Sequence, residues 1–165
     1  MPGRLPALAL ALPLLIGCDA VVGFADPPPD PVREGEWTEM IGAVNALRAE
    51  GATCGSEYFA PAPPLAWHPA LAEAARRHTR DMAENDRFSH RGSDGTSVGD
   101  RADDAGYRWR RVAENIATRH RSVTQVVEAW ARSEGHCHAM MSPRYTEMGA
   151  AEEDRYWTQV FAHPR

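Results

Sequence analysis

The spacing of apolar residues along the chain predicts three amphipathic helices. In each stretch the apolar side chains recur every three or four residues, so a helix places them on one face that can pack against a core. These stretches cover residues 36–51, 68–86 and 122–135. Gly51 and Gly135 are predicted to end the first and third helices, and Ser122 with Gln125 forms a capping-box pattern at the start of the third.

The remaining regular elements are shorter and lie mainly in the second half of the chain. Short helices are predicted over 98–107 and 136–143, and an extended strand over 109–118. Alternating apolar and polar positions on both sides of a polar tip at 152–155 predict a β-hairpin over 145–165. Helices followed by a small late sheet favour an α+β layered domain.

The N-terminal region has the pattern of an export signal followed by a spacer. Residues 1–17 combine a basic start with an apolar run, which is the shape of a secretory signal and is too short for a membrane span. Residues 15–18 (LIGC) resemble the bacterial lipobox, in which Cys18 would be acylated; an ordinary signal cut a few residues later is the alternative. Residues 18–35 are proline-rich and predict a lipid-anchored spacer before a folded domain over 36–165. We therefore expect an exported protein that its lipid holds on a bacterial membrane, facing the periplasm or the cell exterior.

Two cysteines remain once Cys18 is assigned to lipid attachment. Cys54 and Cys137 would form an even pair in an exported, oxidising setting, where disulfides persist. Two buried free thiols are the alternative. A bridge would disfavour Cys137 as a thiol nucleophile, although it lies between His136 and His138.

Composition removes several classes of function. The net charge is −5 and no basic tract is present, so nucleic acid is not an expected partner. The chain contains no lysine, which excludes Schiff-base chemistry and a P-loop. It also lacks the HExxH, GxSxG and CxxC motifs of several enzyme classes.

Five stretches of the sequence together resemble the CAP superfamily, also called SCP/TAPS, in its bacterial secreted branch. In order along the chain they are FSHRGSDG, AGYRW, VAENIA, VVEAWARSEGHCHAMMSP and YWTQVFA. The similarity covers about residues 40–162, and Cys54 and Cys137 stand where bacterial members commonly carry a bridging pair. The resemblance implies a three-layer α-β-α sandwich with a small antiparallel sheet.

The resemblance also implies which polar residues meet in a cleft. The histidines of the family's FSH and GH stretches correspond to His90 and His136, and the glutamate of its ENI stretch corresponds to Glu114. Many members carry a second acid after the helix tryptophan, where this chain has Ser133. Glu134 follows immediately and is a candidate substitute; a solvated charge at the helix end is the alternative.

Two other histidines are assigned different roles. His78 falls on the apolar face of the predicted helix over 68–86, which favours a buried histidine bonded to backbone over a ligand role. His138 is predicted to be a surface or cap residue on the short helix over 136–143. Neither histidine belongs to the predicted cleft.

The predicted cleft could hold zinc or another divalent metal weakly. Imidazole nitrogens are good Zn²⁺ ligands, and two of them leave positions open for water or a further ligand. Structural zinc sites usually have four protein ligands, so His90 and His136 alone predict weak and reversible binding. The alternative is a hydrogen-bonded cluster that stiffens the cleft without an ion.

The leading functional hypothesis is a surface-anchored binding protein that has no catalytic residues. The resemblance implies a mainly non-enzymatic family, so the cleft is expected to bind a lipid, a glycan or another envelope component. A metal-dependent hydrolase is the alternative, with Glu114 as the base acting on water bound at His90 and His136. A purely structural envelope protein is a third hypothesis.

Overall fold

The computed structural model describes the chain from Pro31 to Arg165, with side chains from Trp37 onward. The predicted signal peptide over 1–17, the acylated Cys18 and most of the proline-rich spacer lie outside the described residues. The first helix, α1, covers Pro31–Glu50 and so begins inside the predicted spacer. Proline is well tolerated in the first turn of a helix, so Pro31 can be the first residue of α1. Among the described helices, none is both long enough and apolar enough to cross a membrane.

A four-stranded sheet forms the centre of the domain, in the spatial order β3-β5-β6-β4. The strands cover Ala66–Trp67 (β3), Trp109–Thr118 (β4), Glu147–Glu153 (β5) and Tyr156–Pro164 (β6). β4 and β5 both pair antiparallel with β6, whereas β3 adds to β5 in parallel. β4 is therefore an edge strand among the described strands of this sheet.

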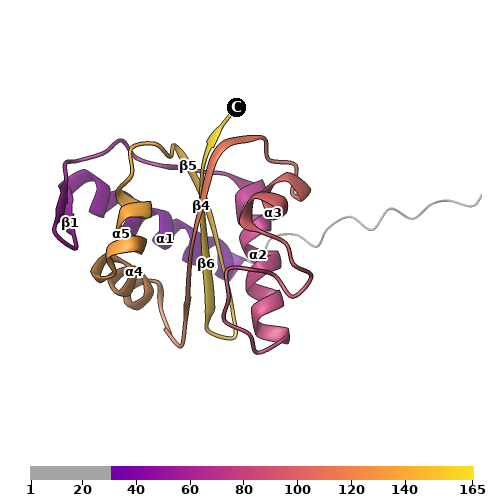
Figure 1. The fold of residues 1–165 in the computed structure, drawn as a ribbon. Coiled ribbons are helices and arrows are strands. Elements are labelled where there is room, and N and C mark those ends of the chain that lie inside the picture. Colours follow the sequence, from indigo (N-terminus) through magenta and orange to yellow (C-terminus); the bar gives the residue numbers. More distant parts are fainter. Residues whose placement is uncertain (1–30) are drawn as a thin grey trace, which may run out of the picture.

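Helices cover both faces of this sheet, as Figure 1 shows with the sheet between two helical layers. On one face lie α2 (Pro69–Glu84) and α3 (Val98–Asp104). On the other face lie α1, α4 (Val123–Arg132) and α5 (Glu134–Met141). This arrangement confirms the α+β class and the three-layer sandwich that the resemblance implied.

Side-chain alternation along the strands builds a core layer on each face of the sheet. Phe161 of β6 joins the buried cluster with Trp130 of α4, and its neighbour Val160 joins the cluster on the α2 face. Burying a large apolar side chain completely stabilises the fold by about 1.5–3 kcal/mol. Gly149 lets α2 approach β5 closely, because a Cβ there would lie 2.1 Å from the Ala72 nitrogen.

The predicted helix end at Gly135 is wrong. α4 ends at Arg132. Ser133 has an extended backbone (φ −93°, ψ 119°) and is both the C-cap of α4 and the N-cap of α5. Gly135 therefore lies inside α5. An extended residue at the junction lets two helices follow each other without a glycine in the left-handed conformation.

The start of α4 forms only half of the predicted capping box. The Ser122 hydroxyl accepts a hydrogen bond from the Gln125 backbone N–H at 3.3 Å, as an N-cap residue does. The Gln125 side chain does not bond Ser122 in return, because its Oε1 accepts from the backbone N–H of Arg121 at 3.0 Å. The Gln125 side chain thus satisfies the backbone N–H of Arg121, which lies just before the start of α4.

Sequence periodicity did not predict three short strands. Two of them, β1 (Ala52–Cys54) and β2 (Glu57–Phe59), form an antiparallel hairpin directly after α1, and the third is β3. Strands of two or three residues are too short for alternation to be recognised. The turn of the hairpin contains Gly55, whose positive φ of 62° favours glycine.

Candidate functional site

The residues predicted to form a cleft surround the edge strand β4. Successive side chains of a strand point to opposite faces, so Glu114 and Asn115 face different helical layers. Glu114 meets His78 of α2 and Arg101 of α3. Asn115 meets α5, where it bonds the backbone of His136. The site therefore lies across the edge of the sheet and draws residues from both helical layers.

The Glu114 carboxylate is the centre of the charge network. Its side chain is only 3% exposed, and its Oε2 accepts a hydrogen bond from Nη2 of Arg101 at 2.7 Å. Its Oε1 lies 2.9 Å from Nδ1 of His90, which comes from the loop after α2. A buried carboxylate is costly unless it is paired, and here both oxygens have a partner. Glu114 thus orients the His90 ring and leaves its Nε2 outside this contact.

The loop that carries His90 is held by α2 and α3. Arg101, which is 5% exposed, donates to the backbone carbonyl of His90 at 3.3 Å and to that of Thr96 at 3.0 Å. Asp81 of α2 accepts a hydrogen bond from the Ser93 backbone N–H at 2.9 Å and another from the Ser93 hydroxyl. These contacts fix the backbone of the loop, while the His90 side chain stays 59% exposed.

His78 lies next to Glu114 and is completely buried, as the sequence predicted. Its Nε2 is 3.7 Å from Oε1 of Glu114, and neither ring nitrogen makes a hydrogen bond of normal geometry. The predicted bond to backbone is therefore not formed, although the Ser89 backbone acts to raise the pKa of His78. Burial has the larger effect and lowers this pKa, while the charge of Glu114 opposes it. His78 is thus an uncharged imidazole packed against the acid near neutral pH.

His136 enters the site from the first turn of α5. Asn115 holds this turn to the sheet by donating from Nδ2 to the His136 carbonyl at 3.2 Å. Burial lowers the pKa of His136, and the charge of His90 lowers it further. Because two positively charged imidazoles repel each other, a charged His90 favours the neutral form of His136.

A disulfide joins Cys54 to Cys137, and so confirms the predicted bridge. It ties α5 to the β1–β2 hairpin across a sequence separation of 83. Both cysteines are fully buried, and Cys137 directly follows His136. The cysteine between the two histidines is therefore a structural link that fixes the turn carrying His136, and its sulfur is not available as a nucleophile.

His90, Glu114 and His136 line one cleft of about 450 Å³, which we call the histidine cleft. Arg144, in the loop after α5, also lines it. A second cavity of about 360 Å³ shares His90 and Glu114 and continues along α3 at Val98. The structure thus brings the three predicted residues together in one concave site.

Ser133 and Glu134 do not line the histidine cleft. Ser133 caps the junction of α4 and α5. Glu134 lies over Gly55, where an added Cβ would be 2.5 Å from its Cδ, so the start of α5 directs this carboxylate to the β1–β2 turn. His138 does line the cleft, although it was predicted to be a surface or cap residue, and its ring packs on Phe59 with centroids 4.9 Å apart.

Sequence reasoning did not find Arg101 and Asn115, which hold the site together. Asn115 carried a usable signal, because a polar residue in an apolar strand next to Glu114 suggests a buried hydrogen bond. Arg101 carried none: its pairing depends on how the long loop between α2 and α3 folds back over β4. Long-range contacts of this kind leave no periodicity in the sequence.

The donor atoms around the cleft fit at most a weakly held metal ion. Among the residues whose side chains are described, no group of three or more His, Cys, Asp or Glu is placed to hold one. Glu114 is already engaged by Arg101 and His90. Nε2 of His90 and the ring of His136 remain, while the ring of His138 packs on Phe59. Two imidazoles need water or ligand atoms to complete a zinc shell.

Comparison with known sequences gives these features a context. Residues 41–161 match the family described as "CAP: Cysteine-rich secretory protein family". The chain is 36% identical over 97 residues to a protein named "Uncharacterized membrane protein YlbC" from Bacillus subtilis (strain 168), a match that covers 59% of this chain and 28% of that protein. The chain spans less than half the length of the curated relatives that it matches.

Comparison with solved structures supports the same fold. An extracellular protein containing a SCP domain from Bacillus anthracis str. Ames matches with a TM-score of 0.71 and 26% identity, over 83% of this chain and 45% of that chain. A structure of NaASP2 with Zn²⁺ matches with a TM-score of 0.52 and 14% identity, over 83% of this chain and 82% of that chain. The second likeness concerns the fold alone.

Proposed function

This chain belongs to the cysteine-rich secretory protein (CAP) family, and from that premise we propose that it is an exported, non-enzymatic binding protein. Its histidine cleft binds a polar ligand of the cell envelope, either a glycan or the headgroup of a lipid. The N-terminal signal and the acylated Cys18 tether the domain to a bacterial membrane. Relatives named as a membrane protein and as an extracellular protein support this location.

The convergence of His90, Glu114 and His136 is the observation that carries the proposal. These residues come from a loop, a strand and a helix, yet they line one cleft of about 450 Å³. A concave site of a few hundred cubic ångströms with a few convergent polar groups is the usual form of a ligand site. A purely structural role would not require an exposed imidazole held in place by a buried acid.

Each polar group of the cleft has its own role toward a ligand. His90 is oriented by Glu114 through Nδ1, so Nε2 is the nitrogen that faces a ligand. His136, whose pKa is lowered, can donate or accept a hydrogen bond in its neutral form. Arg144 adds a guanidinium group that suits a carboxylate or phosphate oxygen. This chemistry favours a polar ligand over an acyl chain.

Calorimetric titration of the full chain tests the cleft. Peptidoglycan fragments and vesicles of envelope phospholipid are titrated separately, which distinguishes a glycan from a lipid headgroup. We expect the pair His90→Ala with His136→Ala to weaken binding at least about tenfold, because two hydrogen-bonding groups are lost. Equal affinity of wild type and this double variant would remove the cleft from the function.

A matched variant controls for the loss of imidazole as such. His163 lies on β6 with its Nδ1 3.4 Å from the Thr146 hydroxyl, and it does not line the cleft. His163→Ala is therefore expected to bind as wild type does. Thermal unfolding of all variants shows whether a loss of binding reflects the site or a loss of folded protein.

A metal-dependent hydrolase is the second candidate, and one observation favours it. The imidazoles of His90 and His136 line the same cleft, which His138 also lines, and the fold neighbour NaASP2 was solved with Zn²⁺. A divalent ion, when bound, would supply Lewis-acid activation of water. Both oxygens of Glu114 are engaged by Arg101 and His90, however, so this acid orients His90 and is poorly placed as a base.

Zinc titration with a hydrolysis screen separates the two candidates. The purified chain is first analysed for metal, then titrated with Zn²⁺ in the presence of ester, peptide and glycan substrates. We expect weak zinc binding that His90→Ala abolishes, with no turnover. Turnover that requires Zn²⁺ and disappears in Glu114→Gln would replace the binding proposal with a hydrolase.

A further inference from the structure

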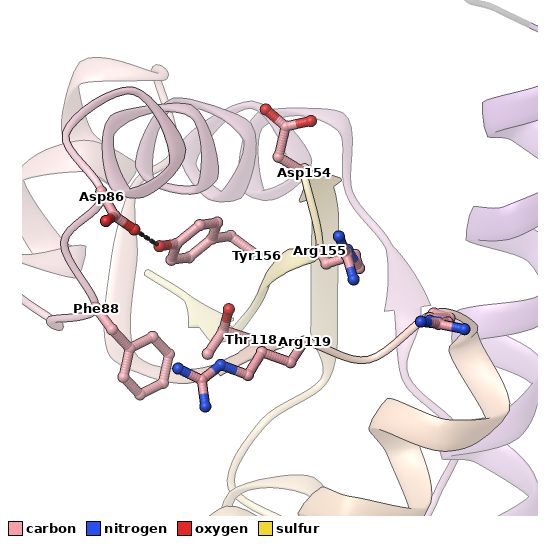
Figure 2. Close-up of a pocket in the computed structure, with 8 residues that line it drawn as sticks. Asp86, Phe88, Thr118, Arg119, Asp154, Arg155 and Tyr156 are labelled. Atoms are coloured by element: carbon pink, nitrogen blue, oxygen red, sulfur yellow. Dashed lines mark hydrogen bonds between the residues drawn. The ribbon is translucent and has the colours of Figure 1, made fainter.

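Another pocket, separate from the two cavities around His90, lies where β4 ends, at the tip of the β5–β6 hairpin (Figure 2). Its volume is about 790 Å³, and its lining comes from the end of α2, the end of β4 with the following loop, and the hairpin turn. Three of its lining residues are Arg119, Arg121 and Arg155, and we call it the arginine pocket. Thr118, which also lines it, lies four positions beyond Glu114 on β4. At the rise of a β-strand this separation is roughly 13 Å, so the pocket is distinct from the histidine cleft.

Three guanidinium groups and two carboxylates line the arginine pocket, but no ion pair joins them among the described residues. None of the three guanidinium groups makes a hydrogen bond or salt bridge with the described residues. Of the two acids that line the pocket, Asp86 already accepts a hydrogen bond from the Tyr156 hydroxyl at 2.8 Å. Figure 2 shows the carboxylate of the other, Asp154, directed away from Arg119. The lining thus has a formal charge of +1 in a chain with a net charge of −5, and its guanidinium groups can reach an anion without breaking an ion pair among the described residues.

The backbone around the pocket adopts a conformation that is unfavourable for two of its arginines. Every non-glycine residue with a positive φ in the described part of the chain lines this pocket: Asp86 (44°), Arg119 (72°), Asp154 (49°) and Arg155 (65°). The two-residue turn at 154–155 is of a kind that asparagine and glycine usually fill. Aspartate tolerates this conformation, whereas arginine adopts it rarely, and strained residues of the second kind cluster at functional sites. The backbone N–H of Arg119 donates to the Arg155 carbonyl at 2.8 Å, which ties the two loops together.

An aromatic surface borders the arginines. Phe88 is 52% exposed, which is unusual for a large apolar side chain, and it lines the pocket together with Tyr156. Figure 2 shows the Arg119 side chain extending toward the Phe88 ring. An exposed ring has apolar area that is free to cover the C–H face of a ligand. The pocket therefore combines groups for an oxyanion with a flat apolar surface beside them.

We propose that the arginine pocket binds an anionic saccharide, a sugar that carries a phosphate or carboxylate group. A guanidinium fork matches the oxygens of these groups and can bind them with two parallel hydrogen bonds. Phe88 packs against the sugar ring while Arg119 and Arg155 hold the anion. The volume of the pocket lies in the usual range for ligand sites, about 300–1,000 Å³. This site is additional to the histidine cleft and does not depend on what the cleft binds.

Titration of the full chain with glucose 6-phosphate, glucose and inorganic phosphate at low salt tests the proposal. We expect glucose 6-phosphate to bind, glucose not to bind detectably, and phosphate to bind more weakly than the sugar phosphate. Arg119→Gln with Arg155→Gln should weaken glucose 6-phosphate binding at least about tenfold, because both charge-assisted contacts are lost. Raising the salt concentration should weaken binding, since exposed charges are screened.

Two further variants make the result specific to this pocket. Arg110→Gln with Arg111→Gln removes two exposed charges elsewhere on β4 and should change affinity by less than about twofold. Phe88→Ala should weaken binding of glucose 6-phosphate but not of inorganic phosphate, because phosphate has no ring to cover.

Several outcomes would overturn the proposal. Glucose 6-phosphate failing to bind wild type, or losing affinity equally in both arginine pairs, would exclude a saccharide site here. Phosphate binding as tightly as glucose 6-phosphate would show a site for a free anion only. Binding to vesicles with anionic phospholipid, without binding to the sugar phosphate, would assign the arginines to a membrane surface.

Discussion

The histidine cleft and the arginine pocket are built along the same strand, but they hold their charged groups in different ways. In the cleft, Glu114 is almost fully buried and both of its oxygens are bound, by Arg101 and His90. In the pocket, the guanidinium groups of Arg119 and Arg155 have no hydrogen-bond or ion-pair partner among the described residues, and both residues have left-handed backbone. Tertiary contacts therefore fix the charged side chains of the cleft, whereas in the pocket they hold the backbone of the turns and not the guanidinium groups.

This difference predicts different kinds of recognition. A cleft whose side chains are fixed by hydrogen bonds to a buried acid loses little conformational entropy when it binds, and it selects ligands by geometry. Unpaired arginines on a surface attract anions over a longer range, and their effect decreases with salt.

The largest effect is expected from removing the disulfide. Cys54→Ser with Cys137→Ser should lower the free energy of unfolding by about 4–5 kcal/mol, because the bridge closes a long loop in the unfolded chain. Denaturant unfolding measures this loss, and reduced wild type should show the same value. Because Cys137 directly follows His136, ligand binding in the histidine cleft should weaken too. The affinity of the arginine pocket for phosphate, measured per folded molecule, should stay unchanged. A loss below about 1 kcal/mol would mean that the bridge does not constrain the fold.

The buried Arg101–Glu114 pair should produce the next largest effect. Arg101→Met leaves the Glu114 carboxylate without its closest partner, which should cost about 3–4 kcal/mol of unfolding free energy. This is the lower part of the range for breaking a buried pair, because His90 still contacts Glu114. Adding Glu114→Gln should restore part of the loss, since no buried charge then remains. If the double variant were as unstable as Arg101→Met, the unpaired charge would not be the cause.

The order and type of the main elements were predictable from the sequence because each depends on local pattern. The helical stripe that includes Leu71 and Met82 needs no distant partner to be recognised, and the alternation around Trp157 and Phe161 marks the final hairpin. Errors occurred where one residue decides a boundary. Ser133 ends α4 through its extended backbone, and no propensity favours this over continuing to Gly135.

The residues that line the candidate site were predictable, but the residues that hold them in place were not. His90, Glu114 and His136 came from a family resemblance, since residues this far apart meet only in the folded chain. His78 and Arg101 were not assigned to the site, although both lie against Glu114. A histidine on the apolar face of a helix gives the same sequence pattern whether it only fills the core or also contacts a functional acid. The arginine pocket was also missed, because its three arginines are spread over two loops.

A smaller effect is expected from acidification. Burial lowers the pKa of His78, so the unfolded chain takes up this proton first when the pH falls below about 6.5. More protons bound in the unfolded state means that stability decreases with falling pH, whereas above that pH this histidine contributes nothing. Between pH about 7.5 and about 5.5 the loss from His78 should be at most about 1.4 kcal/mol. Denaturant unfolding at both pH values measures it, and the decrease should be smaller in His78→Asn. An unchanged decrease in that variant would assign the pH dependence to other groups.

The smallest effect should come from the arginine pocket, and it should have the opposite sign. Arg119 and Arg155 have φ values of 72° and 65°, where a residue with a Cβ costs about 1 kcal/mol or more. Glycine removes that strain but increases the freedom of the unfolded chain by about 0.5–1 kcal/mol, so the two terms nearly cancel. Arg119→Gly and Arg155→Gly should therefore change the free energy of unfolding by between about 0 and +1 kcal/mol each.

Arg111→Gly provides the contrast, because this exposed arginine pairs with His163 in β4, beside a register shift at Trp109, and has no positive φ. Glycine there should destabilise by about 0.5–1 kcal/mol. A clear loss of stability in the Arg119 and Arg155 variants would show that these arginines support the fold. A gain, together with loss of glucose 6-phosphate binding, would show that the chain keeps two strained arginines for what they bind.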